Sequence, residues 1–356
     1  MYQHGGDIYS NNVKLDFSAN INPFGMPYAV KEAASNAIEN CVHYPDAYCR
    51  ELTKSISIKE TIKQEYILCG NGAADLIFRF VLAKSPKKAL LLAPSFSEYE
   101  TALNTINCYI TYHVLQEECG YCLTEQILNE ITEEIDVIIL CNPNNPTGIL
   151  IEKDLLYKIV SQCQKTNTFL FLDECFLDFV QNGEKISLKE QINYNKNIMI
   201  LKAFTKMYGM AGLRLGYCIC SDTTLIKKMR SVNQSWAVSI PAQAAGIAAL
   251  KETEFVQKTI KLIQQEKQYL LLELKNIGIC CYASSANYIF FKAEKGYYEM
   301  LLKKGILIRS CHNYRGLSDG YYRIAIKTHE QNKILIEALK EVKNNVKGNY
   351  DTGNNV

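Results

Sequence analysis

The feature that most constrains the fold is a regular alternation of short apolar runs with stretches of helical spacing. Between two of these runs, the stretch EKDLLYKIVSQCQK places its apolar residues at intervals typical of an amphipathic helix. The pattern predicts an α/β fold, with a mostly parallel sheet between helices. The runs of strand length lie at 88–94, 137–143, 168–174, 197–203 and 213–220.

The second half of the chain predicts a change of architecture. Pro241 opens a long helical region that reaches about residue 277 and is long enough to bridge two domains. Shorter elements follow and suggest a small α+β domain, with a closing helix at about 329–345. We expect a large domain at 40–250, a small domain made of 1–39 and 251–346, and a disordered polar tail at 347–356.

The composition excludes several classes of partner. Lys and Arg total 39 against 37 Asp and Glu, so no overall field favours nucleic acid or an anionic membrane surface. No secretory signal pattern and no bilayer-spanning apolar segment is visible, so we expect a cytoplasmic protein whose partners are small molecules.

The 14 cysteines are scattered, often inside apolar runs, as with Cys141 and Cys218. This placement is typical of small buried hydrophobic residues in a reducing compartment rather than of a disulfide framework. Cys119 and Cys122 form a CxxC, but no second pair stands at zinc-finger spacing and no redox motif flanks it. The sequence therefore predicts no metal site and leaves the role of this CxxC open.

Unusual polar residues stand where the expected strands end. The run VIILC leads into NPNNPTG, which contains Asn145, and TFLFL ends in Asp173. A carboxylate at the end of a buried strand is costly unless something pairs with it. The run NIMIL leads to Thr205 and Lys206. Because active sites of parallel sheets lie at the carboxyl ends of strands, these groups are expected to form one site.

Lysine, carboxylate and a phosphate site together indicate pyridoxal phosphate. The lysine amine condenses with the cofactor's aldehyde, and the carboxylate keeps the pyridine nitrogen protonated. GNGAAD at 70–75 leads into an apolar helix and offers backbone N–H groups to a phosphate, with Arg214 as a second anion-binding group. Each motif alone is also typical of an ordinary turn or surface; the ordered set carries the prediction.

The motifs GNGAAD, NPNNPTG, LDEC, TKMYGMAGLRLGY and YYRIAIK resemble fold-type I pyridoxal-phosphate enzymes of the class I/II aminotransferase group, over nearly the whole chain. The resemblance implies a homodimer. It also implies that Lys206 binds the cofactor covalently. The other residues implied to hold the cofactor are Asp173 at the ring nitrogen, Asn145 at the ring hydroxyl, Phe96 on the ring face, Gly72, Ala73, Thr205 and Arg214 at the phosphate, and Tyr44 reaching across from a partner subunit.

Two branches of that group compete, the threonine-phosphate decarboxylases of cobamide biosynthesis and the histidinol-phosphate aminotransferases. The decarboxylase hallmarks are matched by HGGD at 4–7, LDFSANINPFGMP at 15–27 and IRSCHNYRGL at 308–317. Phe176 stands where the aminotransferases normally have Tyr. Ala203 departs from the Ser or Thr that both branches often place three residues before the lysine.

The decarboxylase resemblance implies a substrate with an α-carboxylate and a distal phosphate. Arg323 is expected to bind the carboxylate and Arg309 a second anion. His4 and Asn22, from a mobile N-terminal segment, are expected to close over the substrate, with His4 near its phosphate. O-phosphothreonine and O-phosphoserine both fit. An aminotransferase on histidinol phosphate and a non-catalytic binding protein are the alternatives.

Overall fold

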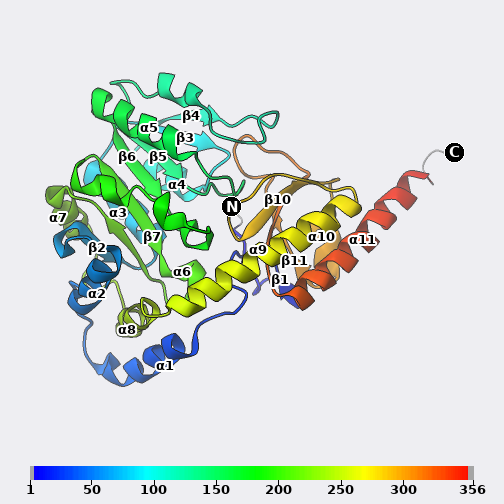
Figure 1. Ribbon diagram of the computed structural model, residues 1–356, viewed down its shortest axis with the longest axis horizontal. Helices are drawn as coiled ribbons and strands as arrows, with labels where there is room; N and C mark the ends of the chain where they lie inside the picture. Colours follow the sequence, from blue (N-terminus) through cyan, green and yellow to red (C-terminus); the bar gives the residue numbers. More distant parts are fainter. Residues whose placement is uncertain (1–3, 352–356) are drawn as a thin grey trace.

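A seven-stranded sheet forms the centre of the larger part of the molecule in the computed structural model, which describes residues 4–351 (Figure 1). The strand order is β2-β8-β7-β6-β5-β3-β4, and β8 runs opposite to the other strands, which all point the same way. The predicted mostly parallel sheet is confirmed. Its strands are β2 (Ile67–Gly70), β3 (Lys88–Ala93), β4 (Tyr109–Val114), β5 (Val137–Cys141), β6 (Phe169–Asp173), β7 (Ile198–Ala203) and β8 (Gly216–Ile219).

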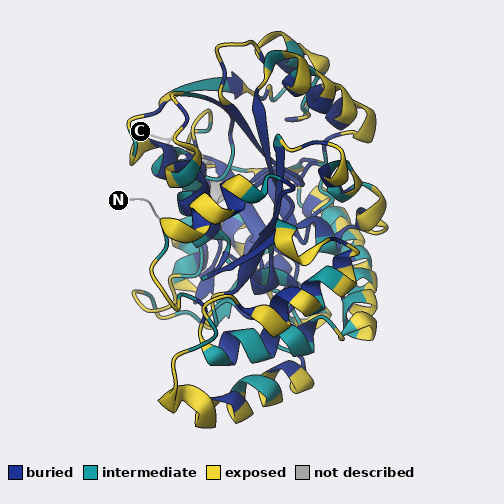
Figure 2. Cartoon of the chain, turned by 90° about the vertical axis from the view of Figure 1, so that its left-hand side faces the viewer, coloured by how far each residue is buried: buried dark blue, intermediate teal, exposed yellow. Residues whose placement is uncertain are grey.

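Successive residues of the central strands pack alternately into two separate hydrophobic cores. Leu90, Ile138 and Leu170 pack into one core, while the neighbouring Leu91 and Ile139 pack into the other, on the opposite face. Burial on both faces explains why these strands read as continuous apolar runs. Figure 2 shows the buried strands between helices whose outer sides are exposed. The helices of this part are α1 (Tyr28–Asn36), α2 (Arg50–Glu60), α3 (Ala73–Lys84), α4 (Glu98–Asn104), α5 (Lys153–Thr166), α6 (Phe204–Met207) and α7 (Thr223–Ser231).

The predicted long helical region is two helices, α8 (Ile240–Ala249) and α9 (Thr253–Asn276). A Cβ on Gly246 would come within 2.5 Å of Leu215 and 2.9 Å of Leu52, so α8 packs closely against the larger part. The break at 250–252 lets α9 leave that surface and run toward the C-terminal part (Figure 1).

The C-terminal part contains a four-stranded antiparallel sheet of order β12-β13-β10-β9. The N-terminal segment joins this region, because β1 (Leu15–Asp16) pairs in parallel with β11 (Ile306–Leu307). The remaining elements are β9 (Cys280–Cys281), β10 (Tyr288–Lys292), α10 (Tyr297–Lys303), β12 (Arg309–Ser310), β13 (Tyr321–Ala325) and α11 (His329–Asp351).

Helix α11 continues past residue 347 to Asp351, so the start of the segment expected to be a disordered tail is helical. The helical hydrogen-bond pattern of α11 simply propagates into polar residues that carry no apolar periodicity. Residues 352–356 of that segment lie outside the described residues. Among the described residues, no helix is long and apolar enough to cross a membrane.

Candidate active site

A cavity of about 460 Å³ lies where the carboxyl ends of β6 and β7 face the antiparallel sheet of the C-terminal part. The register places Asp173 at the end of β6 beside Cys141 of β5 and Leu201 of β7. The cavity brings together most of the residues singled out in the sequence. Its lining includes Lys206, Asp173, Asn145, Ala73, Phe96, Thr205, Arg214, His4, Arg309 and Arg323.

Asp173 is a buried carboxylate with two neutral hydrogen-bond donors. The hydroxyl of Tyr99 donates to Oδ2 at 2.6 Å, and the backbone N–H of Cys175 donates to Oδ1 at 2.9 Å. Burial raises the pKa of Asp173 above its ordinary value, and these hydrogen bonds only partly oppose it. A cationic partner in the cavity would stabilise the charged form.

Lys206 lies in α6, directly after β7, and its amine reaches the cavity. Burial and the positive charge of Arg323 lower the pKa of this amine to about 8. Its Nζ is 5.9 Å from the centre of the Phe176 ring. At pH 7 about a tenth of the amine is therefore neutral and nucleophilic, far more than for a lysine with its ordinary pKa.

Arg323 connects Asn145 to the N-terminal segment. Its Nη1 donates to Oδ1 of Asn145, and its Nη2 donates to the carbonyl of Ser18 at 2.9 Å. Its Nε is buried without a hydrogen-bond partner among the described residues. Because Oδ1 of Asn145 is occupied, its Nδ2 is the atom available to a ligand.

Arg309 and Arg323 stand directly opposite each other on the paired strands β12 and β13. Both are buried, at 6% and 5% exposure. In the part of the chain that the structure describes, their side chains donate to Asn313, Asn145 and the carbonyl of Ser18, and neither forms an ion pair with a carboxylate. Arg309 donates instead to Oδ1 of Asn313 at 2.8 Å and lies 5.2 Å from the ring centre of Tyr314. Two buried guanidiniums without acidic partners form a strong anion site.

The turn between β2 and α3 forms a second anion site. Gly72 has a φ of 85°, and a Cβ at this position would lie 2.5 Å from Nη2 of Arg214. Glycine is therefore required for the guanidinium to approach the N-terminus of α3, where Ala73 begins the helix. Thr205 lines the same cavity. The arrangement brings backbone N–H groups, a hydroxyl and a guanidinium to one place.

Comparisons with known proteins agree with this geometry. The family model described as aminotransferase class I and II matches residues 12–339. The chain belongs to this family. It is 37% identical to the threonine-phosphate decarboxylase of Salmonella typhimurium, over 95% of this chain and 96% of that protein.

Two further relatives represent different activities. The chain is 30% identical to the adenosylcobalamin biosynthesis bifunctional protein CobDQ of Leptospira interrogans, over 96% of this chain but 41% of that protein. A crystal structure of the histidinol-phosphate aminotransferase from Clostridium acetobutylicum superposes with a TM-score of 0.87, at 30% identity, covering 93% of this chain and 99% of that one.

As a member of this family, the protein is a pyridoxal-phosphate-dependent enzyme. The cavity residues fit the cofactor. Asp173 lacks a cationic hydrogen-bond partner among the described residues, and a protonated pyridine nitrogen would supply one. The lysine amine, the phosphate-type anion site at α3 and the Phe96 ring border the same space.

Asn22 does not lie where the sequence placed it. It is buried away from the cavity lining, and its Nδ2 donates to the carbonyl of Met207 at 2.7 Å and to Oγ1 of Thr259 at 2.8 Å. Its backbone N–H donates to the carbonyl of Lys206 at 3.1 Å. The segment around Asn22 is thus tied to the lysine-bearing turn. The expectation of Asn22 as a mobile substrate-binding residue is corrected to a supporting position.

Tyr44 also lies outside the cavity lining. It is 77% exposed, and its ring stacks on Trp236 with centres 4.4 Å apart. Its expected role in a neighbouring subunit's site stays a prediction. His4 does line the cavity, where its Nε2 lies 3.0 Å from Oε1 of Glu98.

The sequence reasoning missed Asn20 and Tyr314, both of which line the cavity. Oδ1 of Asn20 is buried without a hydrogen-bond partner among the described residues. The hydroxyl of Tyr314 lies 3.4 Å from Oδ1 of Asn145. Both residues belong to motifs already quoted, LDFSANINPFGMP and IRSCHNYRGL. The motifs gave the correct segments, but which side chain faces inward depends on the backbone path.

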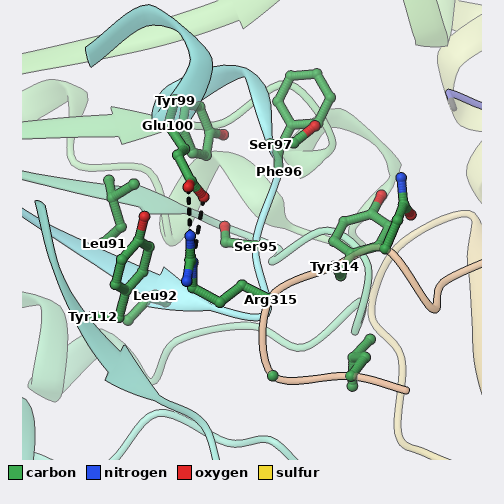
Figure 3. A pocket seen from close by; sticks show the side chains of 13 residues that line it. Leu91, Leu92, Ser95, Phe96, Ser97, Tyr99, Glu100, Tyr112, Tyr314 and Arg315 are labelled. Atoms are coloured by element: carbon green, nitrogen blue, oxygen red, sulfur yellow. Dashed lines mark hydrogen bonds and ion pairs between the residues drawn. The ribbon is translucent and has the colours of Figure 1, made fainter. Parts of the chain in front are cut away.

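A second hollow adjoins the cavity and shares Phe96 and Tyr314 with it (Figure 3). Arg315 crosses this hollow: its Nη2 donates to Oε1 of Glu100 at 2.6 Å, and its guanidinium lies 4.2 Å from the ring centre of Tyr112. The ion pair fastens the loop that carries Tyr314 to helix α4, and the contact with Tyr112 fastens it to strand β4.

Proposed function

We propose that this enzyme decarboxylates O-phospho-L-threonine, or O-phospho-L-serine, to an amino-alcohol phosphate used in cobamide biosynthesis. The similarity to a threonine-phosphate decarboxylase and to an adenosylcobalamin biosynthesis protein supports this choice. Phe176, which lines the cavity, adds support because the aminotransferases that this chain resembles normally have a tyrosine at this position.

The observation that carries the proposal is the pair Arg309 and Arg323. They face each other across β12 and β13, are buried, and form no ion pair with a described carboxylate. Two guanidiniums match a substrate with two anionic groups, a carboxylate and a phosphate. Histidinol phosphate carries a phosphate but no carboxylate, so it leaves one of them without an anion.

Pyridoxal phosphate, when bound, supplies the electron sink that weakens a bond to the substrate's Cα. Which bond is weakened depends on how the chain orients the substrate. Arg323, fixed by Asn145 and Ser18, would hold the carboxylate. Lys206, with its pKa lowered to about 8, would return a proton to Cα after carbon dioxide has left.

Transfer of the amino group from histidinol phosphate is the second candidate. It is favoured by the high structural similarity to a histidinol-phosphate aminotransferase at 30% identity. In that reaction Lys206 would remove the Cα proton instead, and an amino acceptor such as 2-oxoglutarate would be required.

A homodimer, in a cytoplasmic setting, completes the proposal. Large apolar side chains are exposed on α1, on the segment that follows it and beside α8, including Tyr28, Val42, Tyr44 and Trp236. An exposed apolar group of this kind is typical of an interaction surface. We propose that a second copy covers it and that Tyr44 then reaches the partner's cofactor phosphate.

The deciding experiment supplies the purified enzyme with pyridoxal phosphate and then with O-phosphothreonine, O-phosphoserine or histidinol phosphate. Carbon dioxide and glutamate are measured with and without 2-oxoglutarate. We expect carbon dioxide from a phosphoamino acid without any acceptor. Glutamate without carbon dioxide would establish the aminotransferase instead.

A further inference from the structure

The CxxC that the function leaves unexplained forms a tight reverse turn between β4 and the 3₁₀ helix η3 (Glu125–Asn129). The N–H of Cys122 donates to the carbonyl of Cys119 at 3.2 Å. Both central residues have positive φ, 61° at Gly120 and 62° at Tyr121, as in a type I′ turn. A turn brings its first and fourth Cα atoms within about 7 Å. This separation overlaps the range of about 4.4–6.8 Å that a disulfide spans.

The turn is anchored on both sides of Cys119. The hydroxyls of Tyr282 and Tyr321 donate to the carboxylate of Glu117 at 2.5 and 2.7 Å. The ring of Tyr121 packs edge-on against that of Tyr282, with centres 5.0 Å apart. Tyr121 is buried, whereas Cys119 and Cys122 are exposed. The loop is therefore held against the antiparallel sheet while both thiols remain accessible to reagents.

A metal site does not explain this pair of cysteines. Among the residues that the structure describes, no group of three or more His, Cys, Asp or Glu could hold a metal ion. A structural zinc needs four such ligands. The left-handed backbone of Tyr121 costs free energy, which the aromatic contacts of its ring offset. The turn geometry is therefore already present before any bond forms between the thiols.

We propose that Cys119 and Cys122 are a reversible redox site that forms an intrachain disulfide by exchange with a small-molecule disulfide such as oxidised glutathione. One cysteine, as thiolate, attacks the reagent and releases one reduced thiol, which leaves a mixed disulfide. The second thiolate attacks the protein sulfur and releases the other reduced thiol. The two protons lost by the cysteines end on the two released thiols. The disulfide closes a covalent loop of the chain that contains Tyr121, and it locks the turn against the sheet.

The test treats the native full-length protein with oxidised glutathione, alkylates the remaining thiols and maps the peptides by mass spectrometry. We expect the peptide containing both cysteines to lose two hydrogens, to escape alkylation and to recover both thiols with dithiothreitol. Cys119→Ser and Cys122→Ser should each retain a glutathione adduct on the cysteine that is left. Cys280→Ser, which alters another exposed cysteine, should behave as wild type.

Two outcomes would overturn the proposal. One is stable glutathione adducts on both Cys119 and Cys122 of the wild type. The other is no reaction at either cysteine while the exposed Cys41 reacts. A second measurement tests the locking of the turn: the oxidised wild type should unfold at a higher temperature than the reduced form. Equal unfolding temperatures after complete oxidation would contradict the locking. Cys119→Ser, which cannot close the ring, should show no such increase in unfolding temperature.

Discussion

Asn20 and Asn22 are two residues apart, but only Asn20 lines the cavity. The amide of Asn22 bonds to Met207 and Thr259 away from the cavity lining, whereas Oδ1 of Asn20 has no described partner and Asn20 lines the cavity. Asn22→Ala leaves a buried carbonyl and a hydroxyl without this donor, so we expect it to lower the free energy of unfolding by about 1–3 kcal/mol. Asn20→Ala should raise KM for the substrate and leave stability nearly unchanged. Urea unfolding and steady-state kinetics of the two variants measure this contrast, and the reverse pattern would refute the assignment.

The lowered pKa of Lys206 predicts a pH dependence of cofactor uptake. Only the neutral amine condenses with the aldehyde, and its fraction increases as pH rises through about 8. We therefore expect the rate at which the cofactor-free chain takes up pyridoxal phosphate, followed by visible absorption, to rise with pH, to reach half of its maximum near pH 8 and to level off about one unit higher.

A substitution at Arg323 tests the cause of the lowered pKa of Lys206. After burial, its positive charge is the largest contribution that lowers the pKa of Lys206. Arg323→Met should therefore move the inflection of the uptake rate to higher pH. Arg230→Met is a matched control, because Arg230 donates to the carbonyl of Ile67 and does not line the cavity. An inflection that stays in place in Arg323→Met would mean that the charge of Arg323 does not act on Lys206.

At the scale of elements, the ion pair between Arg315 and Glu100 joins the loop after β12 to helix α4. That loop also carries Asn313, which accepts from Arg309, and Tyr314, which lines the cavity. The side chain of Arg315 is 54% exposed, so the pair is worth at most about 1 kcal/mol. Arg315→Met should raise KM about two- to fivefold with little change in kcat, because the anion site is less well positioned.

A double-mutant cycle separates the effect of the ion pair on KM from the effects of Arg315 and Glu100 taken singly. Glu100→Gln should match Arg315→Met, and the double variant should be no worse than either one. Lys295→Met is the control, since Lys295 pairs with Asp319 at 2.6 Å in the same part of the chain but does not line either hollow. Unchanged KM values in all the variants would show that this ion pair does not position the loop.

The sequence predicted elements better than their boundaries and partners. Continuous apolar runs identified β3, β5, β6, β7 and β8, because strands buried on both faces have few polar residues. The two edge strands, β2 and β4, were missed, since β2 has only four residues and β4 mixes exposed with buried residues. The break at 250–252 between α8 and α9 falls inside a stretch of continuous helical spacing, so periodicity does not record it.

Site residues next to strand ends were easier to place than residues in loops. Asp173 and Lys206 follow directly from the ends of β6 and β7, and both line the cavity. Asn22 lies on a loop, where a shift of two residues decides which asparagine faces the cavity and which binds the backbone of the lysine-bearing turn. Such a choice depends on long-range hydrogen bonds that no local pattern contains.

At the scale of the whole molecule, the exposed apolar surface around Tyr44 and Trp236 is where we expect a second copy to bind and to share residues with the active site. Tyr44 stacks on Trp236 and is 77% exposed, so it does not serve the cavity of its own chain. If it binds the cofactor phosphate of a second copy, Tyr44→Ala should weaken cofactor affinity by about tenfold or more, the value of one hydrogen bond to a charged group. Sedimentation should find dimers of the wild type.

A mixing experiment shows whether Tyr44 acts in the site of a second copy or in the site of its own chain. Lys206→Ala removes the reacting amine, and Tyr44→Ala has low activity when the cofactor is limiting. In a hybrid of the two, one site combines the Lys206 of one chain with the Tyr44 of the other and is intact. Because random mixing makes half of the dimers hybrid, about a quarter of wild-type activity should return at limiting cofactor. If Tyr44 acted within its own chain, each hybrid site would carry one lesion and no activity would be regained, which would rule out the shared site.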